Sequence, residues 1–422
     1  MSLPKILFRK CLTCNYDYIC RMQEKHAKPE IEFIALMASL MSIVALSIDA
    51  LLPALSQIGL AVNNLNTTDN QLLITMIFLG LGTGQLVFGP LSDSFGRKPI
   101  VMLGFAVFVI ASFICVAATS LEMMVVGRIL QGVGLSAPRS ISISIIRDSY
   151  KGDYMARVMS FVTALFILIP VVAPALGKFL LDNYNWRAIF YANLGFGVLV
   201  ATWFWLRQPE TLKEKYKVKF DKYIFLNGLK EVLKYKRTLG FTIISGFITG
   251  SFMVFLSASQ QIFEVQYGLV EEFPYIFAGM AIAIGFSTFL NGTLVVRLGM
   301  QRLAFIALIL FCCVAIIYSF LFWSTDNPSL WTLIVFMALQ FFTLGFLFGN
   351  LRAIAMEPIG HIAGIGSAIT GFISILMAVP IATYIGSFVK NTALPLFFGF
   401  AICGSIGLLI FLRMKNIRRR KR

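Results

Sequence analysis

Two residues of opposite charge, Asp49 and Arg128, lie inside long apolar stretches of the sequence. Asp49 comes shortly before Leu55 and Arg128 shortly after Leu121, so at 1.5 Å per residue each lies about 9 to 10 Å from the same end of a helix bundle. A charge at that depth in a membrane costs several kcal/mol unless it is paired or hydrated, and such residues usually line a pathway. We expect Asp49 to carry protons, with Arg128 adjusting its charge. Alternatively, the two form a permanent ion pair that only joins two helices.

Further polar side chains interrupt the apolar stretches and are candidates to line a substrate cavity. Each glutamine has an alternative role as an interhelical hydrogen-bonding group. The candidates are Gln85, Gln131, Arg139, Gln260, Gln261 and Gln340.

A short polar cluster, GPLSDSFGRKP at residues 89–99, separates two of the apolar stretches. Its carboxylate and basic side chains could form an ionic latch that holds one conformation and breaks when the molecule rearranges. Alternatively, the basic residues only anchor the loop among lipid phosphates. The latch candidates are Gly89, Asp93, Gly96, Arg97 and Lys98, together with Arg147 and Asp148 from a second polar segment.

Membrane-spanning helices must position these residues. The chain of 422 residues is 58% hydrophobic and 13% charged, whereas soluble domains contain about 25% charged residues. Its apolar stretches are long enough to cross a bilayer core of about 30 Å. We therefore predict an all-α membrane protein with twelve spans, at about 31–55, 71–91, 99–118, 121–147, 157–181, 187–206, 239–262, 273–296, 303–323, 329–354, 362–388 and 392–413.

The distribution of Lys and Arg predicts the orientation of these spans. If both termini are cytoplasmic, nearly all of the 36 basic residues fall on the cytoplasmic side, as the positive-inside rule requires. The exceptions are Lys178, Arg187 and Lys390 outside, and Arg128 and Arg139 within the fourth span. The net charge of +16 thus indicates contact with anionic lipid headgroups rather than with nucleic acid.

The polar stretch 207–238 divides the spans into two sets of six. Within it, Phe220, Tyr223, Ile224 and Leu229 recur at near-helical spacing among lysines, which indicates a helix lying in the membrane interface or, alternatively, a solvated linker. The predicted units are a cytoplasmic tail (1–30), a six-helix bundle (31–206), a linker (207–238), a second six-helix bundle (239–413) and a basic tail (414–422).

Several motifs together resemble the major facilitator superfamily. Gly89-x-x-x-Asp93-x-x-Gly96-Arg97-Lys98 resembles its signature loop, and Arg128-x-x-Gln131-Gly132 its fourth-span motif. Pro209-Glu210-Thr211 is a common ending of the sixth span, and Pro174-x-x-Gly177 is similar to a reduced proton-antiporter motif in the fifth. The stretches SIDALLPALSQIG (47–59) and IIRDSYKGDYMARVMS (145–160) resemble the Bcr/CflA branch of drug:proton antiporters.

This resemblance implies two six-helix pseudo-repeats and a monomer in the bacterial inner membrane. It implies export of amphipathic, drug-like small molecules in exchange for protons by alternating access, with an acidic residue of span one as the proton carrier. It also implies that span eleven, beginning near Ile362, lies beside the signature loop, where its N-terminal dipole attracts a carboxylate, and that the latch holds the outward-open state and breaks when the halves rock.

Other functions remain as alternatives. A transporter of the same fold could move a siderophore or another natural metabolite. A membrane enzyme or sensor is less favoured, because the only histidines are His26 and His361 and no catalytic triad or phosphate-binding loop occurs. We expect no cofactor and no metal. The loose cluster of Cys11, Cys14, Cys20 and His26 lacks the second ligand pair that is typical of zinc sites.

Overall fold

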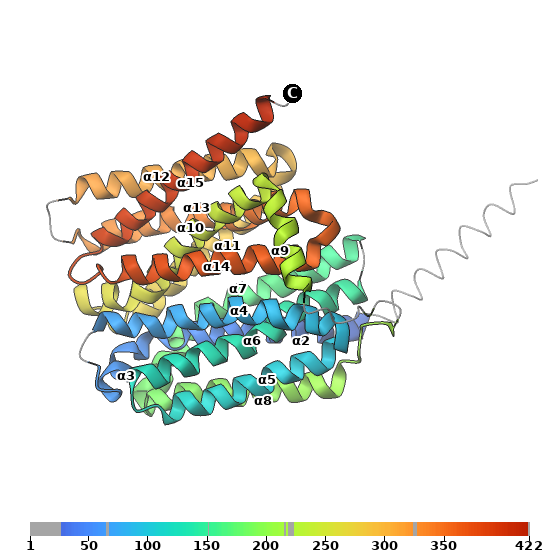
Figure 1. The fold of residues 1–422 in the computed structure, drawn as a ribbon. Helices are drawn as coiled ribbons and strands as arrows, with labels where there is room; N and C mark the ends of the chain where they lie inside the picture. The colour runs from blue at the N-terminus through green and yellow to red at the C-terminus, as the bar shows by residue number, and fades with distance from the viewer. Residues whose placement is uncertain are drawn as a thin grey trace, which may run out of the picture.

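The structure is a bundle of long helices that run roughly along one axis (Figure 1). It is a computed structural model that describes residues 27–64, 67–150, 152–214, 217, 223–323 and 327–420, so the cysteine cluster near the N-terminus lies outside the described residues. Within these described residues, twelve helices are long and apolar enough to cross a membrane. The predicted fold class, an all-α membrane protein with twelve spans, is therefore confirmed.

The first half of the bundle contains six spans. They are formed by α2 (Ala27–Asp49) with η1 (Leu52–Ala54) and α3 (Leu55–Ala61), η2 (Thr67–Gln71) with α4 (Leu72–Phe95), α5 (Arg97–Ala117), α6 (Leu121–Ser149), α7 (Gly152–Asn183) and α8 (Trp186–Arg207).

The second half follows the short helix α9 (Ile224–Lys234). Its spans are formed by α10 (Lys236–Gln260) with the π-helical turn η4 (Gln261–Gln266), α11 (Phe273–Leu298), α12 (Met300–Leu321), α13 (Leu330–Met356) with η5 (Glu357–Ile362), α14 (Ala363–Gly386) and α15 (Leu394–Arg420).

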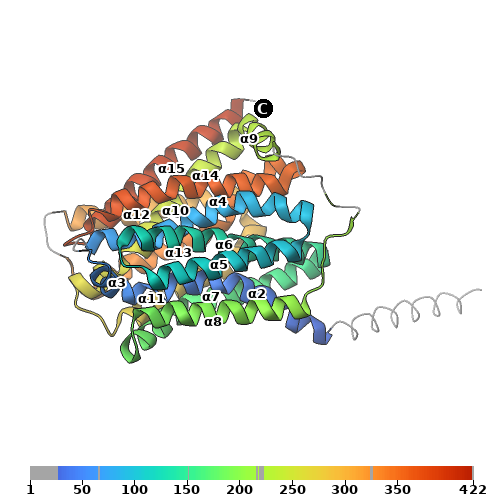
Figure 2. The same cartoon turned by 60° about the horizontal axis from the view of Figure 1, so that its bottom comes forward.

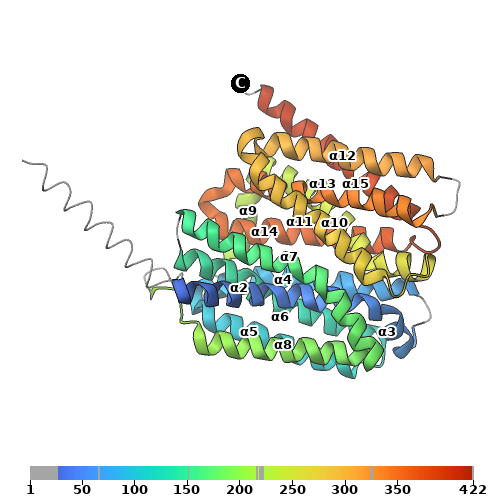
Figure 3. The same cartoon turned by 180° about the vertical axis from the view of Figure 1, so that it is seen from behind.

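The two halves pack against each other through a few of their helices. Helix α4 packs against α14, and α7 packs against α11, which Figure 3 shows from behind. Helices α5 and α8 lie on the side of the first half that faces away from the second half (Figure 2). Below, the end of the bundle with the α4–α5 turn is called the inner end, and the end with α3 the outer end.

The first span is discontinuous at its outer end. Pro53 lacks a backbone N–H and cannot continue an α-helix, so α2 ends at Asp49 and a 3₁₀ turn leads into α3. The first helical region reaches Ala61, beyond the predicted end at Leu55, because the buried Ile58 keeps α3 against the bundle. Asp49 is thus the last residue before the break.

Helices α4 and α6 approach very closely through glycines. A Cβ atom at Gly80 would overlap the carbonyl oxygen of Ile129, and one at Gly132 would overlap that of Ile77. Contacts of this kind let backbones meet where larger side chains would separate them. They fix α6, which carries Arg128 and Arg139, against the helix that ends in the signature loop.

Helix α9 connects the halves at the inner end, where it lies beside α14 (Figure 1). Its buried Val232 packs with Ile359 and Ile369, while Leu226 and Leu233 are exposed. Phe225, Leu226, Leu229, Val232 and Leu233 recur at helical spacing and form one apolar stripe, of which one edge packs on the bundle and the other is exposed. Phe220, which the sequence places in the same amphipathic pattern, lies outside the described residues.

Candidate functional site

The signature loop is a tight turn built on Gly96 and Glu210. Glu210, just after α8, accepts hydrogen bonds from the backbone N–H groups of Arg97 and Lys98, both at 3.0 Å. A carboxylate at the N-terminus of a helix is favourable, and here it caps α5. Partial burial raises the pKa of Glu210, but hydrogen bonds from four backbone N–H groups outweigh that effect and hold the pKa below its usual value.

Arg97 is the centre of the ion-pair network that we predict to act as a latch. Its side chain is 4% exposed, pairs with Asp93 of α4, and donates from Nε to Asp148 Oδ2 of α6 at 3.1 Å. It also donates to Ser92 Oγ at 2.8 Å. One guanidinium thus joins α4, α5 and α6 within the first half. Arg147, which we expected to take part, is exposed and has no hydrogen-bond or ion-pair partner in the described part of the chain.

Only one of the two latch glycines is required by this geometry. Gly96 has φ +110°, and a Cβ atom there would lie 2.7 Å from Glu210 Oε2. Around Gly89, by contrast, nothing lies within 4 Å of the position of an added Cβ. Of the two glycines in the signature loop, only Gly96 is therefore required by the space and the backbone conformation around it.

Replacing Gly96 by Ala is expected to destabilise the fold. A non-glycine residue at this φ costs about 1–3 kcal/mol, in addition to the clash with Glu210. Gly89→Ala is the matched control and should be neutral or slightly stabilising, because Ala is the better residue inside a helix. Thermal unfolding of both variants in detergent compares them. Equal unfolding temperatures would contradict the steric role of Gly96.

Asp49 lies at the break in the first span and is 5% exposed. The predicted span-five motif packs directly beside it, since a Cβ atom at Gly177 would overlap the carbonyl oxygen of Ala50. Pro174 is also buried on α7. The carboxylate and the reduced antiporter motif are therefore neighbours, a relation that their distance in sequence does not reveal.

Arg128 takes part in a network that does not include Asp49. It is 1% exposed and donates to the carbonyl oxygen of Leu73 on α4 and to Gln131 Oε1, both at 2.8 Å. Gln131 in turn donates to Ser112 Oγ of α5 at 2.9 Å. Among the described residues, no ion pair or hydrogen bond joins Asp49 and Arg128. Although Asp49 and Arg128 lie at similar depth, they do not contact each other in this conformation, because Arg128 points toward α4 and α5.

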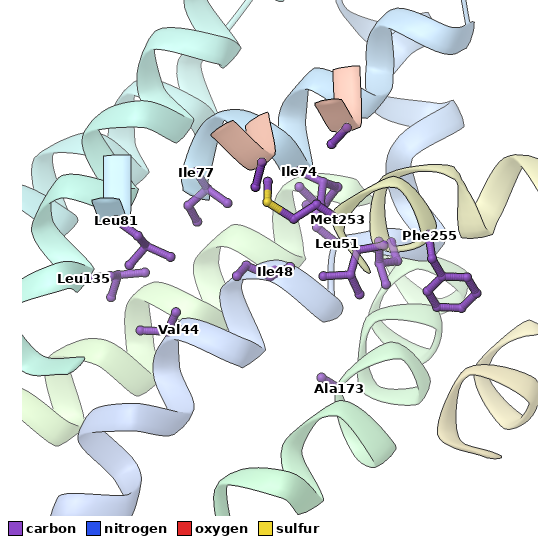
Figure 4. Packing of buried hydrophobic residues seen from close by; sticks show 14 of the residues in the cluster. Val44, Ile48, Leu51, Ile74, Ile77, Leu81, Leu135, Ala173, Met253 and Phe255 are labelled. Carbon is purple, nitrogen blue, oxygen red and sulfur yellow. The ribbon is translucent and has the colours of Figure 1, made fainter. Parts of the chain in front are cut away.

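The outer ends of the halves are closed against each other. Figure 4 shows Met253 of α10 next to Ile74 and Leu51 of the first half, and all three are fully buried. Nearby, Gln260 Nε2 donates to Ser56 Oγ across the halves at 2.9 Å. Apolar contact and this hydrogen bond together form an outer barrier between the halves.

Two carboxylates of the second half also lie at the outer barrier. Glu264, in the π-helical turn, accepts from Gln260 at 2.6 Å, and its other carboxylate oxygen is buried without a hydrogen-bond partner in the described structure. Lys178 of α7 reaches Glu271 across the halves at 3.0 Å. The sequence reading missed Glu264 because it lies just beyond the predicted end of its span, although a π-helical turn is often found at functional sites.

The remaining cavity candidates separate into two groups. Gln340 bonds the carbonyl oxygen of Phe311, and Gln261 bonds that of Lys390, so both serve contacts within the second half. Gln85 and Arg139 have no hydrogen-bond or ion-pair partner among the described residues, and both are partly exposed. These two side chains are therefore free to contact a ligand.

Comparison with known proteins agrees with this architecture. A sequence profile of the Major Facilitator Superfamily matches residues 37–374. The chain is 28% identical to the bicyclomycin resistance protein homolog of Haemophilus influenzae, over 92% of this chain and 98% of that protein. It is 26% identical to the multidrug resistance protein MdtL of Vibrio parahaemolyticus, over 89% of this chain and 93% of that protein.

Solved structures share the fold at low sequence identity. A D-xylose–proton symporter superposes with a TM-score of 0.69 at 14% identity, covering 91% of this chain and 96% of its own. The human organic anion transporter MFSD10 superposes with a TM-score of 0.63 at 15% identity, and the superposition covers 91% of this chain and 99% of that one.

Proposed function

Because this chain belongs to the major facilitator superfamily, we propose that it exports amphipathic, drug-like molecules in exchange for protons by alternating access. It is a transporter rather than an enzyme. Its relatives are named for bicyclomycin resistance and multidrug resistance, and the similarity extends over most of each chain. These relatives support the class of substrate, while the coupling ion is argued from the residues.

The observation that carries the proposed coupling is the position of Asp49. It is a buried carboxylate at a break in a spanning helix, with no cationic partner in ion-pair distance among the described residues. A charge in such a site is costly unless water or a cation compensates it. The bound proton is therefore retained while the outer barrier is closed, and it is exchanged when a rearrangement admits water or substrate.

The closed barrier and the latch give this cycle its two conformational controls. The outer barrier consists of Met253 packed on the first half and the Gln260–Ser56 hydrogen bond. At the inner end, Arg97 holds α4, α5 and α6 as one body. We infer that the halves rock about the α4–α14 and α7–α11 contacts, opening one end as the other closes.

The chain is a multi-pass membrane protein. The distribution of basic residues supports a bacterial inner membrane with both termini in the cytoplasm, and contact of the inner end with anionic headgroups. We propose that one chain is sufficient for transport, because both halves that form the pathway are present in it.

Expression in an efflux-deficient bacterial host tests the substrate class. We expect growth protection against more than one apolar toxic compound, since relatives of similar length are named as multidrug resistance proteins. An Asp49→Asn variant expressed at equal level is the matched control and should not protect. If no toxic compound is exported but growth under iron limitation depends on the protein, the siderophore alternative replaces drug export.

A further inference from the structure

Arg139 is a cation at the boundary between the halves, without an acidic partner among the residues that the structure describes. It lies on α6 one turn beyond Leu135, which Figure 4 shows next to Leu81 of α4 and Val44 of α2. Its side chain is partly exposed and makes no hydrogen bond or ion pair with the residues that the structure describes. About 15 Å of helix separate it from the inner end of α6 at Ser149.

Arg352 reaches the same boundary from the second half. It lies on α13 and donates from Nη2 to Ser367 Oγ of α14 at 2.9 Å. Ser367 lies one helical turn before Gly371 on α14. A Cβ atom added at Gly371 would lie 3.2 Å from Gln85 Nε2 of α4. The side of α14 that holds Arg352 is therefore the side that faces the first half.

The two arginines converge on the same part of α4. Gly84, adjacent to Gln85, packs on Ser136 of α6, which lies on the same face of that helix as Arg139. Arg139 lies one turn nearer the inner end than Ser136, and Ser367, which holds Arg352, lies one turn nearer the inner end than Gly371, so the two arginines lie at the same level of α4. Gln85 of α4 lies beside Gly371 and has no hydrogen-bond partner among the described residues.

We propose that Arg139 and Arg352 bind the acidic group of an amphipathic molecule, a carboxylate, sulfonate or phosphate, at the boundary between the halves. This inference rests on the proposed function, because it names the substrate class of the transport pathway. Gln85 and Ser367 supply further polar contacts.

The electrostatics favour an anion at this position. Two cations at the same level of the boundary are unfavourable without a counter-ion, and an anion between them would relieve the repulsion. Guanidinium groups present planar pairs of donors that match such oxygen atoms. Three described acidic residues of the inner end are already paired, Asp93 and Asp148 with Arg97, and Glu357 with Arg237.

A pair of probes that differ only in charge tests the proposal. We would measure binding of 2-naphthalenesulfonate and its neutral analogue 2-naphthalenesulfonamide by calorimetry, with the purified protein in phosphatidylcholine nanodiscs. The sulfonate should bind about tenfold more tightly, as expected for charge-assisted hydrogen bonds. Equal affinities, or no binding of the sulfonate, would overturn the proposal, and this comparison requires no variant.

Variants then assign the preference to the two arginines. Arg139→Gln and Arg352→Gln should each lower sulfonate affinity about tenfold and change sulfonamide affinity less than about twofold. Arg139→Lys should keep most of the preference, because it retains the charge. Arg413→Gln, at an exposed position on α15, is the control and should behave as the unmodified protein. An unchanged preference in both glutamine variants would contradict the assignment.

Nanodiscs that also contain phosphatidylglycerol identify the source of the anion. If the protein still binds the sulfonate more tightly than the sulfonamide in these nanodiscs, the result supports an exported acidic molecule. If phosphatidylglycerol abolishes that difference in affinity, the site binds a lipid headgroup. Proton coupling is tested separately. If pH-driven export occurs without any sulfonate preference, only the anion site fails.

Discussion

Asp49→Asn is expected to abolish accumulation driven by a pH gradient while substrate binding remains. Asparagine keeps the shape of the side chain but cannot take up and release a proton. A pH difference of about one unit supports about tenfold accumulation per proton exchanged, and the variant should reach a ratio of about one. The measurement is uptake into proteoliposomes with an acidic lumen, together with binding of the same compound at equilibrium.

Asp182→Asn is the matched control for this experiment. Asp182 is a carboxylate near the outer end of α7 that pairs with Lys178, and Lys178 keeps a second partner in Glu271 when Asp182 is changed. This variant should accumulate substrate normally. Normal accumulation by Asp49→Asn would show instead that Asp49 is structural, and Glu264 at the outer barrier would then be the next carboxylate to test.

Asp93→Asn is expected to abolish most transport without loss of expression. The amide retains the size of the carboxylate but removes one of the two negative charges that hold the buried Arg97. A hydrogen bond to a charged group contributes about 1.5–3 kcal/mol, so a conformation that depends on it should lose about tenfold or more of its population. Initial transport rates in vesicles with equal protein content measure the effect.

Arg147→Gln separates the latch from simple membrane anchoring. Arg147 is next to Asp148 in sequence, but it is exposed and has no partner within the described residues. The Arg147→Gln variant should therefore transport substrate at nearly the normal rate. If Asp93→Asn is also normal, or if Arg147→Gln is equally defective, the loop acts through its charge at the lipid surface rather than through Arg97.

The spans and the members of the latch could be predicted from sequence because their signals are local. A run of apolar residues of membrane length predicts a spanning helix wherever it occurs. In the same way, Asp93 and Arg97 are one helical turn apart, so their contact follows from spacing alone. Proline at position 53 also explains why the first span breaks just after Asp49.

Contacts between distant residues could not be predicted in the same way. Depth places Asp49 and Arg128 at one level, but it does not give the direction of either side chain around its helix. Arg128 instead donates a hydrogen bond to a backbone carbonyl oxygen of α4. Because every residue carries such an acceptor, no sequence pattern indicates which one is used. Likewise, Arg352 falls among the basic residues that the sequence assigns to the cytoplasmic side, and no sequence pattern shows that it bonds Ser367 of α14.

The most direct test of proton-coupled export uses the unmodified protein and one compound against which it protects cells. Proteoliposomes with an acidic lumen should accumulate that compound through the inside-out molecules, and nigericin, which collapses the pH difference, should release it. The same compound should drive protons out of the lumen at a rate that depends on its concentration. Accumulation that is equal with and without the pH difference, or substrate movement without proton movement, would contradict the account.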